Sequence, residues 1–142
     1  MDNRCLYKAK RTDNGEWVKG DLLHGNSGIC YICSQYTEMD DFVQAHAVEV
    51  DPSTICLYSG KKYMNCEMAF EGDIFESEVD GSIMILRYGT FQAYCPVDNA
   101  YMDSVGFYAE CKGYPDMPIG DLREYALKKG NIFDNPELLV VK

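Results

Sequence analysis

The stretch Phe70–Glu76, FEGDIFE, constrains the fold of this chain more than any other stretch does. Gly72 can adopt backbone angles that are closed to other residues, so Glu71-Gly72-Asp73 predicts a tight turn. Ile74 and Phe75 follow at once and begin a strand. The stretch therefore predicts a chain reversal that leads directly into a buried strand.

Turn signals separate short apolar runs along the rest of the chain. Asn14-Gly15 and Asp80-Gly81 are strong hairpin signals. Phe42–Val50 is compatible with a strand or with a mixed loop and strand, and Pro96–Asp103 is expected to be a loop. The other predicted strands are rich in β-branched, aromatic or alternating apolar residues. They are Leu6–Lys10, Glu16–Leu23, Ile29–Tyr36, Ile55–Tyr58, Ile74–Val79, Ser82–Tyr88, Gly89–Cys95 and Val105–Cys111.

Only Asp121–Lys129, DLREYALKK, has helical character. Leu122, Tyr125 and Ala126 recur at a helical spacing, an acid begins the segment, and Gly130 follows it as a stop signal. One short C-terminal helix against about eight strands predicts a mainly β domain, organised as a small barrel with an additional N-terminal β-hairpin or meander.

Length and composition bound the class of protein. At 142 residues the chain suits a single domain, and a hydrophobic fraction of 46% with 11 tyrosines is far from the composition of disordered proteins. No run approaches the ~18 apolar residues of a membrane span, and the N-terminus lacks the apolar run of a signal peptide. The sequence predicts a folded protein of the cytoplasm that does not engage a membrane.

The net charge of the chain indicates which kinds of partner the protein could bind. Thirteen Lys and Arg residues against 23 Asp and Glu residues give a net charge of −10. The average surface therefore repels phosphates, which argues against diffuse binding to DNA or RNA. An acidic surface suits a basic partner or a protein that imitates DNA, and it also favours plain solubility.

Four segments together resemble the YopX-like family of phage and prophage proteins: Asn14–Leu23, Val50–Gly60, Phe70–Phe75 and Gly130–Leu139. The resemblance implies an SH3-like barrel, a source in a bacteriophage or prophage within a bacterial host, and no known reaction. It implies one YopX-like domain over residues 1–142, with the barrel core at roughly 50–142 and the N-terminal β segment at roughly 1–49. Lys61–Ala69 departs from the family pattern, and Asp121–Lys129 resembles an insertion against the usual strand.

Cys30 and Cys33 have a spacing that zinc knuckles and thiol redox sites also use. A zinc site needs two further ligands, such as Cys56 or Cys66, and an extended chain would point residues three apart to opposite faces. The uneven spacing of all seven cysteines favours reduced and mostly buried thiols. The seven are Cys5, Cys30, Cys33, Cys56, Cys66, Cys95 and Cys111.

The remaining polar residues predict no catalytic, cofactor or metal site. His24 and His46 lack a nucleophile in a recognisable setting. The carboxylate pairs fit a solvated acidic edge or structural turns better than hydrolytic chemistry. These pairs are Asp40 with Asp41, Glu71 with Asp73, and Glu76 with Glu78. Gly72, Asp73 and the turn Asp134-Asn135-Pro136 are interpreted as architectural.

The tyrosines supply the one candidate binding surface. Tyr94, Tyr101, Tyr108 and Tyr114 could form an aromatic face, or could pack the rim of the barrel. We therefore expect a non-enzymatic interaction protein that binds another protein, or itself as a homo-oligomer, through an acidic and tyrosine-bearing surface. The alternatives are a nucleic-acid-linked regulator or DNA-mimic inhibitor, and a zinc-binding or hydrolytic protein.

Overall fold

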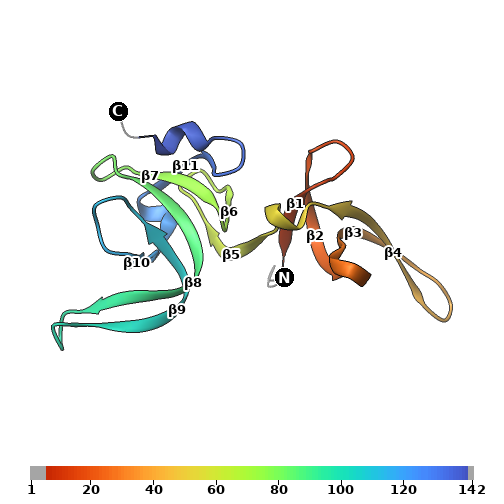
Figure 1. Ribbon diagram of the computed structural model, residues 1–142, viewed down its shortest axis with the longest axis horizontal. Helices are drawn as coiled ribbons and strands as arrows, with labels where there is room; N and C mark the ends of the chain where they lie inside the picture. The colour runs from red at the N-terminus through yellow and green to blue at the C-terminus, as the bar shows by residue number, and fades with distance from the viewer. Residues whose placement is uncertain (1–5, 141–142) are drawn as a thin grey trace. The chain divides into compact units, whose positions relative to one another are not determined.

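The computed structural model describes residues 6–140. The architecture is mainly β, as the sequence predicts, with 57% of the described residues in strands and no helix of seven or more residues among them. The strands form two antiparallel sheets, one of which is a half-barrel (Figure 1). They are β1 Tyr7–Lys10, β2 Trp17–His24, β3 Cys30–Glu38, β4 Val43–Val50, β5 Cys56–Lys62, β6 Met68–Phe70, β7 Asp73–Ser77, β8 Ile83–Cys95, β9 Ala100–Glu110, β10 Met117–Pro118 and β11 Ala126–Asn131.

The described helices are short 3-10 turns. They are η1 Asn26–Gly28, η2 Pro52–Thr54, η3 Leu122–Glu124 and η4 Pro136–Leu139. None of them has the length or the apolar character needed to cross a bilayer.

The chain divides into two compact units, Met1–Tyr58 and Ser59–Lys142. Within the first unit the strand order is β4-β3-β2-β1, and Tyr7 and Lys8 of β1 pair with Leu57 and Cys56 at the start of β5. Ala9, Ile32 and Val50 are buried in its core together with Cys30. The predicted Asn14-Gly15 hairpin is confirmed, because β1 and β2 pair in register from Tyr7↔Gly20 to Lys10↔Trp17.

The second unit holds a five-stranded antiparallel sheet in the order β10-β9-β8-β7-β11. Residues from this sheet, from β6 and from the segments around them form its core: Tyr63, Ala69, Phe75, Met84, Leu86, Ala109, Cys111, Ile119, Leu122 and Ala126. The predicted hairpin at Asp80-Gly81 is confirmed, since β7 and β8 pair on either side of it.

The turn before β7 is also confirmed. Gly72 has φ +88°, which few other residues adopt, and its backbone N–H donates to Leu86 O at 2.7 Å. Ile132 N donates in turn to Gly72 O at 2.9 Å. The strand begins at Asp73, and Ile74 and Phe75 directly after it are fully buried.

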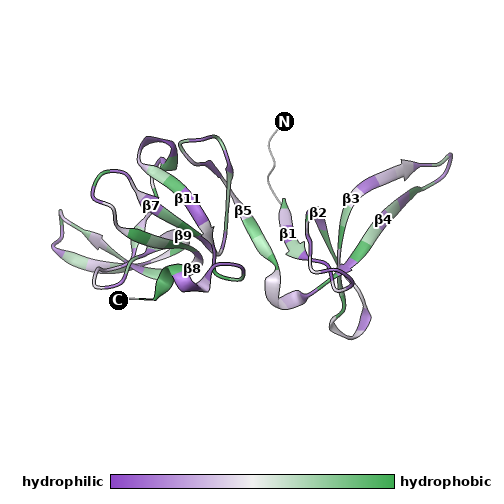
Figure 2. Cartoon of the chain, turned by 90° about the horizontal axis from the view of Figure 1, so that it is seen from above, coloured by the Kyte–Doolittle hydropathy of each residue, from purple (hydrophilic) through white to green (hydrophobic). Residues whose placement is uncertain are grey.

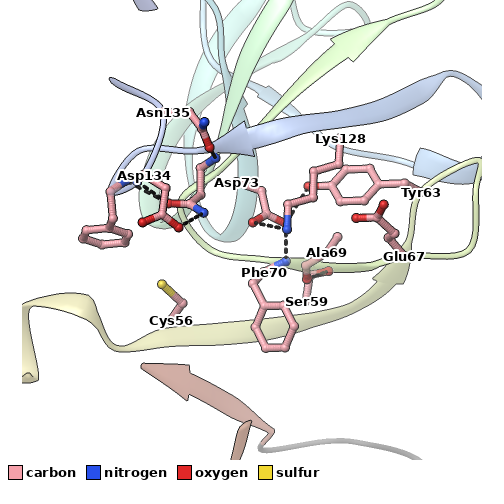
Figure 3. Close-up of polar contacts among 12 residues, drawn as sticks. Cys56, Ser59, Tyr63, Glu67, Ala69, Phe70, Asp73, Lys128, Asp134 and Asn135 are labelled. Carbon is pink, nitrogen blue, oxygen red and sulfur yellow. Dashed lines mark hydrogen bonds and ion pairs between the residues drawn. The ribbon is translucent and has the colours of Figure 1, made fainter. Parts of the chain in front are cut away.

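Asp73 is itself fully buried and lies among polar partners from three segments (Figure 3). Its Oδ2 accepts hydrogen bonds from the Tyr63 hydroxyl and from Phe70 N, each at 2.9 Å. Lys128 Nζ on β11 lies 3.7 Å from Oδ1. Burial first, and then the Asp73 charge, raise the pKa of Tyr63 far above its usual value, so this hydroxyl stays a donor.

The prediction of a helix over Asp121–Lys129 is wrong. Asp121 Oδ1 accepts from Arg123 N at 3.2 Å and begins one 3-10 turn, but the chain becomes β11 at Ala126. An isolated helix this short is only marginally stable. As a strand, β11 instead pairs its backbone N–H and C=O groups with those along the edge of β7. Pairing Ala126 with Ser77 buries Ala126, and the same register brings Lys128 to Asp73.

The turn after β11 is built by side chains, as predicted for Asp134-Asn135-Pro136. Asn135 Oδ1 accepts from Asn131 N at 3.2 Å, and Asn131 Oδ1 accepts from Phe133 N and Asp134 N at 2.9 Å each. The Asn131 amide also donates to Asp134 Oδ2 at 3.0 Å. These bonds occupy the polar groups of the turn and make it architectural.

Replacing Asp73 tests the importance of this buried carboxylate. In Asp73→Ala the Tyr63 hydroxyl, Phe70 N and Lys128 lose their acceptor, so we expect the free energy of unfolding to fall by about 3 kcal/mol. Urea denaturation followed by circular dichroism measures the change. As the control, exposed Asp98→Asn should alter it by less than about 0.5 kcal/mol. Equal stability of the two variants would contradict the assignment.

Candidate protein-interaction surface

The hairpin of β8 and β9 reaches well beyond the core of its own unit (Figure 1). Its strands pair continuously from Ile85↔Glu110 to Cys95↔Ala100. The residues near its base are buried, as Leu86 and Ala109 show, whereas most residues toward its tip are exposed. The predicted loop at Pro96–Asp103 is shorter than expected, because Ala100–Asp103 belongs to β9. We call the exposed part, residues 88–107, the β8–β9 arm.

Two opposed glycines mark the base of the arm. Gly89 and Gly106 are cross-strand partners with φ of +149° and +150°. Glycines at such positions let strands bend away from a core, and aromatic side chains commonly cover the gap that they leave. Here the rings of Phe91 and Tyr108 stack on one face of the hairpin with centroids 4.8 Å apart.

The other face of the arm carries a row of exposed aromatic and apolar side chains. Side chains alternate along a strand, so Tyr88, Thr90, Gln92 and Tyr94 share this face with their partners on β9. Tyr88 packs on Phe107 with ring centroids 4.8 Å apart, and Tyr94 packs on Tyr101 at 5.3 Å. We call the set Tyr88, Tyr94, Tyr101, Val105 and Phe107 the aromatic face.

The aromatic face is exposed although its members pack against one another. Tyr94 and Tyr101 are 49% and 54% exposed, and Val105 is 74% exposed. The Tyr94 hydroxyl donates to Asn99 Oδ1 at 2.5 Å, and the Gln92 amide donates to Asp103 Oδ1. Cross-strand aromatic pairs and these polar bonds hold the exposed side chains in place.

A mostly apolar hollow lies elsewhere in the second unit. It has a volume of about 320 Å³ and is lined by residues that include Met84, Cys111, Tyr114, Ile119 and Tyr125. The Tyr125 hydroxyl donates to Ile119 O at 2.5 Å, which occupies the main polar group of that ring. Burial, assisted by the charge of Asp80, raises the pKa of the Cys111 thiol. The Cys111 thiol therefore forms the reactive thiolate less readily than an ordinary cysteine does.

The four tyrosines named from the sequence do not form one surface. Tyr94 and Tyr101 lie together on the aromatic face, whereas Tyr108 lies on the opposite face of the hairpin and Tyr114 lines the hollow. Sequence reasoning missed Tyr88 and the paired glycines. The signal for Tyr88 was its even spacing with Tyr94 along one strand, which places both side chains on the same face.

The cysteines are separate thiols within residues 6–140, and Cys5 lies outside the described residues. Cys30, Cys33 and Cys56 are buried in the first unit, while Cys66 is exposed. Cys30 Sγ lies 3.8 Å from Gly28 O and Cys33 Sγ lies 2.9 Å from Gln35 O. Among the described residues no group of three or more His, Cys, Asp or Glu side chains is placed to hold a metal.

The carboxylate pair Glu76 and Glu78 and the two histidines have separate surroundings. Glu76 forms an ion pair with Lys129 at 3.2 Å, and its proposed companion Glu78 is exposed beyond the end of β7. His46 Nε2 lies 2.5 Å from Thr37 Oγ1 on the exposed part of the β3–β4 hairpin, and His24 is exposed at the end of β2. These contacts describe surface and structural roles.

No protein-family model matches the chain, and no curated protein matches it significantly.

Adding a side chain at the paired glycines tests the bend of the arm. Gly106→Ala meets no atom within 4 Å, so its cost comes from the φ of +150° alone. We expect the free energy of unfolding to fall by about 1 kcal/mol. Urea denaturation measures it, with Ser104→Ala on the same strand as the control. A Gly106→Ala variant as stable as the parent would contradict a strained glycine position.

Thiol labelling tests the placement of the described cysteines. Cys66 is exposed and should react with iodoacetamide first, whereas Cys111 should react much more slowly because it is buried and its pKa is raised. A raised pKa leaves less thiolate at a given pH, so labelling of Cys111 should still be slow at pH 8. Peptide mass spectrometry identifies each labelled site, and rapid modification of Cys111 in the native protein would contradict this order.

Proposed function

We propose that this chain is a non-enzymatic protein-interaction module of a phage or prophage, acting in the cytoplasm of a bacterial host. In this proposal the curved sheet of the second unit corresponds to the SH3-like barrel of the YopX-like family. The module binds another protein, or a second copy of itself, through the β8–β9 arm. The observation that carries the proposal is the exposed aromatic face of that arm.

Exposed aromatic groups in a row are a feature of protein interfaces. Tyrosine buries a large apolar area with little loss of side-chain freedom, and Tyr94 and Tyr101 are already held by their mutual contact. Contiguous apolar patches are also uncommon on soluble monomers unless they serve binding. A partner seated on the arm would remove Tyr88, Tyr94 and Val105 from water.

The charge of the arm favours a protein over a nucleic acid. Tyrosines can stack on bases, but single-stranded nucleic acid also requires a positively charged groove. No lysine or arginine occurs between Arg87 and Lys112, whereas Asp98, Asp103 and Glu110 lie in that interval. The arm would therefore repel phosphates beside its own aromatic face.

The arm also leaves backbone groups available for pairing. β7 pairs with β8 only at Ile83–Ile85, and β10 pairs with β9 only at Tyr108–Ala109. Toward the tip, the outer edges of β8 and β9 have no neighbouring strand in the described sheet. Exposed strand edges pair readily with strands of other chains. A partner could thus combine strand pairing with contacts to the aromatic face.

A pull-down from the bacterial host tests the proposal. We expect the tagged protein to retain a stoichiometric protein partner after nuclease treatment, and the Tyr94→Ser/Tyr101→Ser variant to lose it. Loss of two central aromatic contacts should weaken binding by at least about tenfold. The matched control is Tyr114→Ser, an exposed tyrosine outside the arm.

Three outcomes would contradict the proposal. The partner could dissociate on nuclease treatment, which would favour a nucleic-acid-linked role. It could remain bound to the double variant, which would place the interface elsewhere. Tyr114→Ser could lose it equally, which would remove the arm's special role. Analytical ultracentrifugation of the purified protein distinguishes self-association, which the double variant should abolish.

A further inference from the structure

The β3–β4 hairpin of the first unit presents a second exposed surface that does not depend on the β8–β9 arm. Its base is buried at Ile32 and Val50, but every residue from Ser34 to Ala47 is exposed. Figures 1 and 2 show this hairpin extending past the other strands of its unit. We call residues 36–43, with the turn that they contain, the hairpin tip.

The hairpin tip carries apolar side chains in contact with solvent. Met39 and Phe42 flank the turn and are 47% and 61% exposed, and Val43 is 59% exposed. The cross-strand pairs Glu38↔Val43 and Tyr36↔Ala45 place Tyr36, Val43 and Ala45 on one face together with Glu38. β4 is the edge strand of the described sheet, so its outer backbone edge has no neighbouring strand there.

The hairpin tip is held in place by its own polar contacts. The Tyr36 hydroxyl donates to Asp21 Oδ2 on β2 at 2.6 Å, and Met39 N donates to Phe42 O at 2.8 Å across the turn. Thr37 Oγ1 and His46 Nε2 lie 2.5 Å apart between the two strands. A surface that is ordered before it binds loses less conformational freedom on binding.

The charged residues of the hairpin tip all have one sign. Asp40 and Asp41 form the turn itself, and Glu38 precedes it. No lysine or arginine occurs anywhere between Lys19 and Lys61, an interval that also contains Asp21, Glu49 and Asp51. Charges interact strongly within about 8 Å at physiological salt, so the acids act on anything that covers Met39, Phe42 or Val43.

We infer that the hairpin tip docks on a basic protein surface, one that presents lysine or arginine side chains around exposed apolar residues. Asp40, Asp41 and Glu38 attract and orient this partner, and Met39, Phe42 and Val43 supply the apolar contact. A second copy of this acidic chain fits poorly, because its net charge of −10 opposes the same carboxylates.

A designed peptide tests the inference directly. The probe is a 14-residue amphipathic peptide of leucine and lysine, titrated into ¹⁵N-labelled full-length protein and followed by NMR. We expect the largest chemical-shift changes at residues 36–43 rather than at the other acidic surfaces of the chain. A peptide with glutamate in place of lysine should not bind, and one with serine in place of leucine should bind at least about tenfold more weakly.

Variants separate the two contributions. Asp40→Asn/Asp41→Asn should weaken binding of the peptide about tenfold and make the affinity less dependent on salt. Phe42→Ser/Val43→Ser should also weaken binding about tenfold but leave the salt dependence of the affinity unchanged. The matched control for charge is Asp98→Asn/Glu124→Gln, two exposed acids of the second unit, which should change affinity by less than about twofold. The NMR spectrum of each variant confirms that it is folded.

The results that would overturn the inference are equally specific. Shift changes spread over many acidic sites, or centred on residues 88–107, would show that the hairpin tip is not preferred. Equal binding of the serine and lysine peptide would remove the apolar contribution. The Tyr94→Ser/Tyr101→Ser variant should bind this peptide normally, so failure of the β8–β9 arm as an interface leaves the present test unaffected.

Discussion

The second unit depends on the buried carboxylate of Asp73. Removing a charge from water costs several kcal/mol unless hydrogen bonds and an opposite charge replace the solvent. Tyr63, Phe70 and Lys128 supply that replacement, and they come from the chain before β6, from β6 itself and from β11. One side chain thereby joins two segments close before it in sequence to β11, which is distant in sequence, while the turn at Gly72 holds Asp73 at the start of β7.

The stable base gives the β8–β9 arm its geometry. Leu86 and Ala109 are buried in the core, so the two strands leave the sheet in a defined register that continues to the tip. The opposed Gly89 and Gly106 then allow the hairpin to bend, and Phe91 stacks on Tyr108 on one face of the hairpin. The aromatic face is thus a continuation of the core side of the sheet into solvent. Tyr88 and Tyr94 lie on the same face of β8 as the buried Leu86. The same division into a buried base and an exposed end appears in the β3–β4 hairpin.

Much of the fold could be predicted because its signals are local. The hairpins at Asn14-Gly15 and Asp80-Gly81, and the turn at Gly72, follow from backbone preferences that a few residues carry by themselves. The error at Asp121–Lys129 has the opposite origin, since its helical periodicity was real but β7 offered a backbone edge that a short helix could not satisfy. The candidate surface was predicted in part, because two of its tyrosines were named from the sequence. The positions of the Tyr108 and Tyr114 side chains depend on the strand register and on the course of the following loop, which the sequence alone does not give.

The amino-acid sequence by itself determined that the chain is mainly β, where several of its turns fall and that its surface is acidic. These properties depend on composition and on neighbours along the chain. The tertiary structure alone decided that Asp73 is a structural centre, that Asp121–Lys129 becomes a 3-10 turn and a strand, and that the ends of two hairpins remain exposed. Each of these outcomes depends on which contacts form between residues far apart in sequence, such as Lys128 with Asp73. Local patterns carry no information about which distant partner a side chain will contact.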